Sequence, residues 1–192
     1  MKSQKILWFD VETTGLNSVE NGIIQLSGLI EVDHEVVSSF DYKVNIFDSD
    51  KINVDALEVS GIKLSDIKTF ENPLKVHDDL IKKLSSHCSK YDKYDKFFPA
   101  GYNCKFDIDF LSQWFLKCND KYLGSWINWR FIDPLALVNI LSLEGKIRLE
   151  NHKLVTLCEY LDIEIDAHNA MSDITATRAV YHKLREMAKI TY

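Results

Sequence analysis

The stretch from Ile6 to Leu16, which reads ILWFDVETTGL, is the most informative part of the sequence. Its four consecutive apolar residues predict a buried strand, and Thr-Thr-Gly predicts the turn that ends it. Because side chains alternate faces along a strand, Asp10 and Glu12 point the same way, about 7 Å apart. Two like charges this close repel each other unless a cation lies between them. We therefore interpret the pair as ligands of a divalent ion such as Mg²⁺ or Mn²⁺, with exposed acids that cap neighbouring backbone as the alternative.

The composition predicts one globular domain over residues 1–192. The chain has 46% hydrophobic and 27% charged residues, which is ordinary for a domain with a sizeable core. Its net charge of −6 argues against non-specific wrapping of nucleic acid but permits a local basic groove. The four cysteines lack the C-x-x-C spacing, so reduced thiols in a reducing cytoplasm are expected. With neither a signal-type nor a membrane-length apolar run, we expect a soluble protein with no membrane partner.

Hydrophobic periodicity predicts strands first, and then strands and helices in alternation. The predicted strands are 6–12, 22–32, 36–44, 97–102 and 129–132, and the predicted helices are 53–60, 73–88, 107–115, 134–143, 153–161 and 174–188. Three early strands so close together suggest an antiparallel meander. This order predicts an α/β fold with a mixed sheet and helices packed against it.

Two segments have unusual composition. Residues 85–96 are rich in lysine, tyrosine and aspartate. Their balanced charge favours a solvated loop over a surface that binds single-stranded nucleic acid. Residues 114–131 contain three tryptophans together with other aromatic residues. They are interpreted as a base-stacking platform, a dimer surface or part of the core, and burial is the default because large aromatics dominate cores.

Three further polar residues extend the acidic motif. Asp107 stands where a short strand gives way to a helix, where α/β sites gather, although helix N-termini also favour acids. His168 lies five residues before Asp173, and on one continuous helix these side chains would be about 140° apart. For both side chains to act in one site, His168 must therefore lie in the loop or at the entrance before the helix that contains Asp173. His87 and Asp92 have the same spacing but lie in the charged loop, so we treat that match as coincidental.

In this combination the sequence resembles the DnaQ-like, or DEDDh, 3′ to 5′ exonucleases, which include proofreading subunits of bacterial replicative polymerases, ribonuclease T and oligoribonuclease. The resemblance runs from Ile6 to about Tyr181. Its three motifs are matched in chain order by Asp10 with Glu12, by Asp107, and by His168 with Asp173. A sister subclass has tyrosine four residues before the last aspartate, where this chain has Asn169. The resemblance implies a ribonuclease H-like fold with a mixed five-stranded sheet.

The site chemistry expected from these residues is two-metal phosphodiester hydrolysis. Four carboxylates can hold two divalent ions, Mg²⁺ or Mn²⁺, and His168 can act as the general base. The substrate would be a nucleic acid 3′ end, with a nucleoside 5′-monophosphate as product. By similarity, the terminal nucleotide would meet Thr13, Thr14 and Leu16, and more weakly Asn103 and Phe106. Turn formation or core packing are the alternatives for these five residues.

Several alternatives stay open at this point. Single-stranded DNA is the first choice of substrate, but no motif reports a contact to a 2′-hydroxyl, so an exoribonuclease or oligoribonuclease is the first alternative. A non-catalytic nucleic-acid-binding adaptor with the same fold is the second. A polymerase partner is not evident from the sequence, and the aromatic segment permits a homodimer. Asp133, before Pro134, is interpreted as structural.

Overall fold

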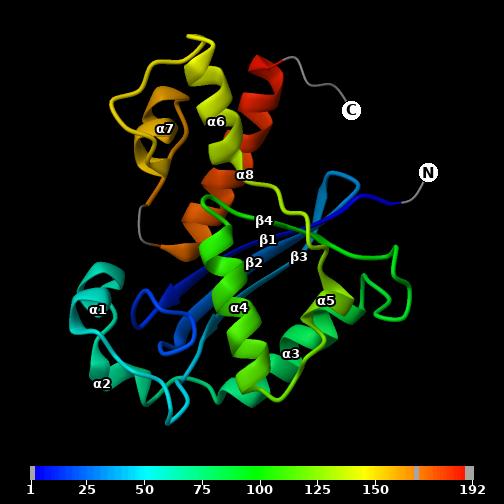
Figure 1. Ribbon diagram of the computed structural model, residues 1–192, viewed down its shortest axis with the longest axis vertical. Coiled ribbons are helices and arrows are strands. Elements are labelled where there is room, and N and C mark those ends of the chain that lie inside the picture. Colours follow the sequence, from blue (N-terminus) through cyan, green and yellow to red (C-terminus); the bar gives the residue numbers. More distant parts are fainter. Residues whose placement is uncertain (1–2, 167–168, 189–192) are drawn as a thin grey trace.

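The computed structural model describes residues 3–166 and 169–188. Four strands form one mixed sheet in the order β3-β2-β1-β4 (Figure 1). They are β1 (Lys5–Thr13), β2 (Ile23–Val32), β3 (Glu35–Lys43) and β4 (Phe98–Ala100). The first three are antiparallel neighbours, and β4 runs parallel to β1. The α/β class and the early meander are confirmed.

The prediction of a fifth strand is wrong for the described residues. Residues 129–132 contribute only an isolated bridge between Ala100 and Ile132. The chain around this segment is hydrogen-bonded at two points, from Asn128 N to Phe97 O, just before β4, at 2.7 Å and from Ile132 N to Pro99 O of β4 at 2.9 Å. Between these points the side chain of Asn128 accepts a hydrogen bond from Arg130 N and forms a turn. This turn lifts the chain away from the sheet, so a continuous ladder does not form.

Helices surround the sheet. They are α1 (Val54–Ser60), α2 (Leu64–Ile67), α3 (Pro73–Ser85), α4 (Lys105–Lys117), α5 (Leu123–Trp126), α6 (Pro134–Leu143), α7 (Leu154–Tyr160) and α8 (Ala170–Met187). The longer helices match the predicted ones, whereas α2 and α5, four residues each, were not predicted. Asp133 caps α6 by accepting a hydrogen bond from Leu135 N, which supports its structural interpretation. No helix in the described part of the chain is long and apolar enough to cross a membrane.

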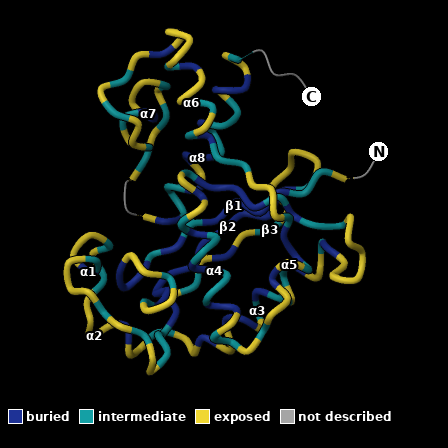
Figure 2. The backbone as a smooth tube through the Cα atoms, viewed as in Figure 1, coloured by how far each residue is buried: buried dark blue, intermediate teal, exposed yellow. Residues whose placement is uncertain are grey.

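The two faces of the sheet bury different sets of residues. Leu7, Phe9 and Val11 of β1 belong to the main core with α3 and α4. Ile6 and Trp8 point to the opposite face, where they pack with Ile174 of α8. Helices α6 and α7 share a separate small core with α8, and Figure 1 shows these three helices gathered on one side of the sheet. Figure 2 shows the central strands β1 and β2 largely buried, whereas the edge strand β3 is mostly exposed.

The aromatic segment is divided between core and surface. Trp114, Phe115 and Trp126 are buried, as the default interpretation predicts. Trp129 and Phe131, however, are exposed. All four cysteines are free, and three of them are buried, as expected for reduced packing thiols.

Candidate active site

Strand β1 carries the first two acidic residues on the face that α8 covers. Asp10 and Glu12 alternate with Trp8, so they share its side of the sheet. Asp10 lies opposite Ser27 of β2, and Glu12 lies opposite Gln25. The pair therefore stands at the carboxyl end of a central, buried strand, past the last residue that pairs with β4 and still paired with β2.

The third acidic residue comes from the first turn of α4. Before this helix the chain turns at Asn103, whose φ of 58° is left-handed and whose N–H donates to Asp133 Oδ1 at 3.1 Å. Asp107 follows and is only 4% exposed. Its Oδ1 accepts a hydrogen bond of 3.1 Å from Val11 N, the residue between Asp10 and Glu12. This bond fixes Asp107 beside the carboxylates of β1.

The fourth acidic residue comes from the first turn of α8. Asn169 caps this helix, with its side chain accepting a hydrogen bond from Ser172 N at 3.3 Å. Asp173 follows in the first turn and is half-buried. Figure 1 shows the first turns of α4 and α8 near the carboxyl end of β1. His168, the predicted general base, lies outside the described residues.

The four carboxylates interact electrostatically. Burial raises the pKa of Asp10 well above its ordinary value, and the charges of Asp107, Glu12 and Asp173 raise it further. Burial also raises the pKa of Asp107 to about 8, although its hydrogen bond from Val11 N acts in the opposite direction. Residues from three separate segments of the chain thus form one acidic cluster. Gathering like charges in a buried place destabilises the fold unless a cation neutralises them.

The donor chemistry of this cluster fits hard divalent cations. Carboxylate oxygens are the ligands that Mg²⁺ and Mn²⁺ prefer. Cys104 lies near Asp107 and Asp10, but burial and these charges raise the pKa of its thiol, which disfavours the thiolate that a soft metal would need. Within residues 3–166 and 169–188, however, no three His, Cys, Asp or Glu side chains already form a group that could hold an ion. Metal binding by the described carboxylates would therefore require their side chains to reorient. A cavity of about 180 Å³ beside it, lined by Asp10, Asp173 and Thr177 among others, leaves room for that adjustment.

The two threonines after Glu12 have their hydroxyl groups engaged within the protein. Thr13 Oγ1 donates to Gly15 O at 2.7 Å, and Thr14 Oγ1 donates to Lys51 O at 2.7 Å. Thr14 Oγ1 also accepts a hydrogen bond from Gly22 N. Both side chains are buried. The turn-forming interpretation accounts for these hydroxyls, so their donation to a nucleotide stays a prediction that would require new partners.

The remaining predicted substrate residues differ in their exposure. Leu16 is 85% exposed at the turn after Glu12, so its apolar side chain is accessible to a bound nucleotide. Asn103 is exposed at the entrance to α4. Phe106 is half-buried and packs against Phe110, with ring centroids 4.8 Å apart, which favours its structural interpretation. Contact of these three with a nucleotide stays a prediction.

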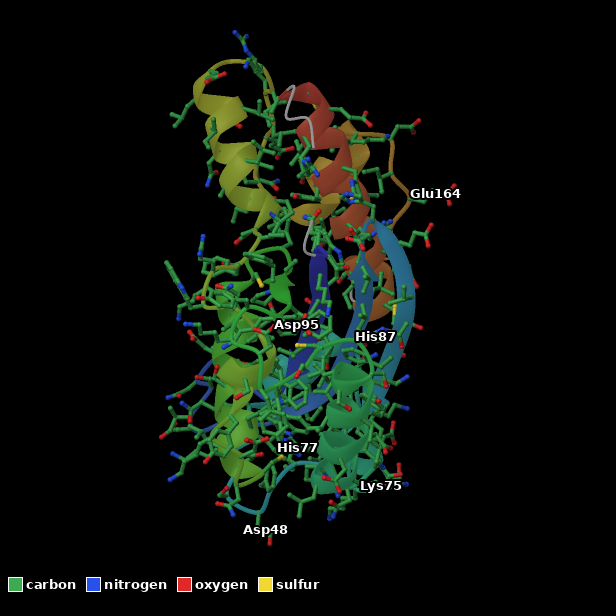
Figure 3. The ribbon with its side chains drawn as sticks, turned by 90° about the vertical axis from the view of Figure 1, so that its right-hand side faces the viewer. Asp48, Lys75, His77, His87, Asp95 and Glu164 are labelled. Carbon is green, nitrogen blue, oxygen red and sulfur yellow. The ribbon has the colours of Figure 1, made fainter. Side chains whose placement is uncertain are left out.

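The coincidental histidine and aspartate pair lies in the loop after α3. His87 follows that helix, at the end away from Lys75 (Figure 3). Asp92 is exposed, and its side chain accepts a hydrogen bond from Tyr94 N in a local turn. Neither residue is among the groups that shift the pKa of Asp10 or Asp107.

A polar network beside the cluster was missed from the sequence. Gln25 and Ser27 are buried on β2, and both donate hydrogen bonds to Asp41 Oδ1 of β3 at 2.7 Å. Lys43 donates to Gln25 Oε1. The network continues the polar strip that Asp10 and Glu12 begin on β1. The alternation of β2 hinted at polar residues on one face, but only the register places them opposite the acids.

The fold and this site define a ribonuclease H-like α/β domain with an acidic cluster at the end of its central strand. A family model described as "Exonuclease" matches residues 7–181. The chain belongs to this exonuclease family, and the resemblance to DnaQ-like exonucleases is confirmed at that level.

The relatives of this chain are much longer proteins. DNA polymerase III PolC-type from Oceanobacillus iheyensis is 28% identical over 183 residues, which cover 92% of this chain and 11% of the relative. The enzyme of the same name from Halalkalibacterium halodurans is 30% identical over 186 residues, covering 94% and 11%. The chain thus spans about a tenth of the length of the curated relatives it matches.

Solved structures of exonuclease I have the same fold. Exonuclease I of E. coli in complex with a dT13 oligonucleotide superposes with a TM-score of 0.79 and 19% identity, over 97% of this chain and 42% of that one. The zinc-ion-bound form of the E. coli exonuclease I complex with single-stranded DNA gives 0.78 and 20%, over 98% and 41%. At these identities the likeness concerns the fold alone.

Proposed function

We propose that this chain is a 3′ to 5′ exonuclease that removes nucleoside 5′-monophosphates from single-stranded DNA. The observation that carries the proposal is that Glu12, Asp107 and Asp173 lie close enough to Asp10 for their charges to raise its pKa, in a member of the exonuclease family. The choice of DNA is supported by the DNA polymerase relatives and by the oligonucleotide bound to exonuclease I.

The same four carboxylates would hold two divalent cations, with Mg²⁺ or Mn²⁺ best suited to an all-oxygen donor set. When bound, such ions stabilise negative charge on the attacking and leaving oxygens at phosphorus. The protein supplies the positioning. Asp107 is oriented by its hydrogen bond from Val11 N, and Asp173 is presented by the capped first turn of α8. Asp10, which interacts with the other three, is the candidate to contact both ions.

The proposed reaction consumes one water molecule. The water oxygen forms a bond to phosphorus, and the bond between phosphorus and the 3′-oxygen of the preceding nucleotide breaks. One water proton goes first to a base, for which His168 is the predicted residue, and the departing 3′-oxygen gains a proton. Leu16 would pack against the last bases and hold the strand end in place. No oxidation or reduction takes place.

The proposal is tested by incubating the purified protein with Mg²⁺ and end-labelled oligomers. Single-stranded DNA, duplex DNA and RNA are each labelled at the 5′ or the 3′ end, and the products are resolved by size. Stepwise shortening from the 3′ end, lost in Asp10→Ala and in EDTA, is the expected result. Faster cleavage of RNA than of DNA would support the exoribonuclease alternative instead. Binding without cleavage in either Mg²⁺ or Mn²⁺ would overturn the proposal in favour of a non-catalytic adaptor.

A further inference from the structure

A groove of about 490 Å³ runs between α4 and residues 120–131, on a different side of α4 from Asp107. We call it the α4 groove. Its lining combines lysine side chains with exposed apolar ones, chiefly Lys96, Lys105, Lys121, Leu116, Trp129 and Phe131. Neither the acidic cluster nor the fold accounts for this combination.

The aromatic side chains of the groove are displayed on an anchored turn. Trp129 is 84% exposed and Phe131 is 43% exposed, although rings of this size are usually buried. The turn that carries them is hydrogen-bonded on both sides to the segment 97–99, by Asn128 N to Phe97 O and Ile132 N to Pro99 O. Because the backbone is already fixed, a partner that covers these rings need not order a loose loop.

The charge of the groove is positive although the chain as a whole is acidic. Three lysines line it, of which Lys105 also pairs with Asp109 one turn further along α4. The guanidinium of Arg130 adds positive charge, 5.4 Å from the centre of the Trp129 ring. Among the described lining residues the one acid is Asp120, and both of its oxygens face protein groups. Its Oδ1 accepts a hydrogen bond from Tyr122 N at 2.7 Å, and its Oδ2 lies 3.2 Å from Nε2 of His77 on α3.

The Phe131 end of the groove borders the loop that leads to the acidic cluster. Gly101 N donates to Ile132 O at 3.2 Å, and Asn103 N donates to Asp133. This loop opens into α4, whose first turn carries Lys105 on the groove side and Asp107 on the cluster side. A strand leaving the cluster therefore crosses one helix width, about 10 Å, to reach the groove.

We propose that the α4 groove binds a single strand of nucleic acid upstream of its 3′ end. The lysines contact phosphates, and the rings of Trp129 and Phe131 stack on bases, which is the combination that suits single strands of any sequence. The 10 Å crossing corresponds to about three stacked nucleotides at 3.4 Å each, so the groove holds nucleotides beyond the third from the end. The direction of the strand rests on the proposed function, whereas the binding itself does not.

Binding is measured with a fluorescein-labelled dT12 oligomer by anisotropy, with every variant built on Asp10→Ala to prevent cleavage. We expect Trp129→Ala to weaken binding by roughly 5- to 100-fold, because stacking of one base is lost. We expect Lys105→Ala with Lys121→Ala to lower the slope of log Kd against log salt by about 1.4, the value for two phosphate contacts on a single strand.

Matched controls come from exposed residues elsewhere. Tyr160→Ala removes an exposed aromatic ring from α7, and Lys75→Ala with Lys82→Ala removes two exposed lysines from α3. Both should bind dT12 as the parent protein does. If the α3 double variant loses as much affinity and salt dependence as the groove variant, net charge accounts for the effect and the proposal is overturned.

Substrate length separates this proposal from the proposed function. In the protein that retains Asp10 and can therefore cleave, Trp129→Ala should reduce kcat/KM for dT12 at least about 5-fold more than for dT3, which is too short to reach the groove. An equal loss on both lengths means that Trp129 supports the fold or the cluster, and overturns the proposal. If the wild-type protein cleaves nothing, the binding data still decide the groove. If Trp129→Ala leaves dT12 binding intact but dissolves a dimer in analytical ultracentrifugation, the groove is instead a contact between copies.

Discussion

Replacing Asp107 by asparagine should stabilise the metal-free protein while it destroys the proposed metal site. Asparagine keeps an oxygen that accepts the hydrogen bond from Val11 N, so the change removes charge and little else. Burial moves the pKa of Asp107 from its ordinary 3.8 to about 8. At pH 7, about three pH units above the ordinary pKa of 3.8, the folded protein must keep this carboxyl group protonated. At about 1.4 kcal/mol per unit, this lowers the free energy of unfolding by about 4 kcal/mol.

We expect Asp107→Asn to raise the free energy of unfolding by about 2 to 4 kcal/mol in EDTA at pH 7, which raises Tm by roughly 5 to 15 °C for a chain of this size. The sign follows from proton binding. A carboxyl group with a raised pKa binds more protons in the folded state, so wild-type stability falls as pH rises from 3.8 towards 8. The advantage of the variant should therefore be small at pH 4 and largest near pH 8.

Thermal unfolding followed by circular dichroism, in EDTA and in Mg²⁺, measures both effects. Mg²⁺ at about 100 times its Kd should stabilise the wild-type protein by about 2.7 kcal/mol and the variant by much less. Asp109→Asn is the matched control, because Asp109 lies on the same helix in an exposed pair with Lys105 and should change stability by under about 1 kcal/mol. An Asp107→Asn protein that is no more stable than wild type at pH 8 in EDTA would refute the buried acidic cluster.

Three further predictions concern other parts of the chain. His168→Ala should lower kcat by roughly 10² to 10⁴ with Mg²⁺ affinity retained, as measured by single-turnover kinetics and calorimetry; an unchanged rate excludes it as the base. Leu16→Ala should raise Kd for single strands roughly 10-fold without altering unfolding, since the side chain is 85% exposed, and unchanged affinity removes its predicted role. Gly28→Ala should cost about 1 to 3 kcal/mol in urea unfolding, because its Cβ would lie 2.3 Å from Phe40, whereas Gly124→Ala, with open space around it, should be tolerated.

The parts of the site that could be predicted are those encoded by local pattern. Alternation along β1 was enough to place Asp10 and Glu12 on one face, since a strand has a period of two whatever it packs against. Asp107 was predictable because a short strand and a helix meet just before it. Asp133 was interpreted correctly because Asp before Pro is a common helix start, and it caps α6.

The features that escaped prediction depend on contacts between distant segments. The partners of Thr14 are Lys51 and Gly22, which no local pattern connects to it. The predicted strand at 129–132 has strand-like residues, but the turn at Asn128 interrupts its pairing with β4. Composition likewise cannot divide the aromatic segment into buried and exposed rings, because the division depends on which rings the tertiary packing places in the main core.

The same tertiary contacts explain how a stable fold tolerates four acids in one place. Asp10 sits between buried neighbours on a central strand, and Asp107 is held there by a backbone N–H that belongs to that strand. Asp107 is buried and tied to the main chain of β1, whereas Asp10 is half-buried beside the cavity. The electrostatic penalty of gathering these acids is expressed in the raised pKa values of Asp10 and Asp107. Asp173 and Leu16, by contrast, lie at a helix start and a turn, where adjustment disturbs little of the core. One acid fixed by the main chain, beside side chains that can adjust, is the arrangement expected of a site that is completed only when its cations and a strand end are bound.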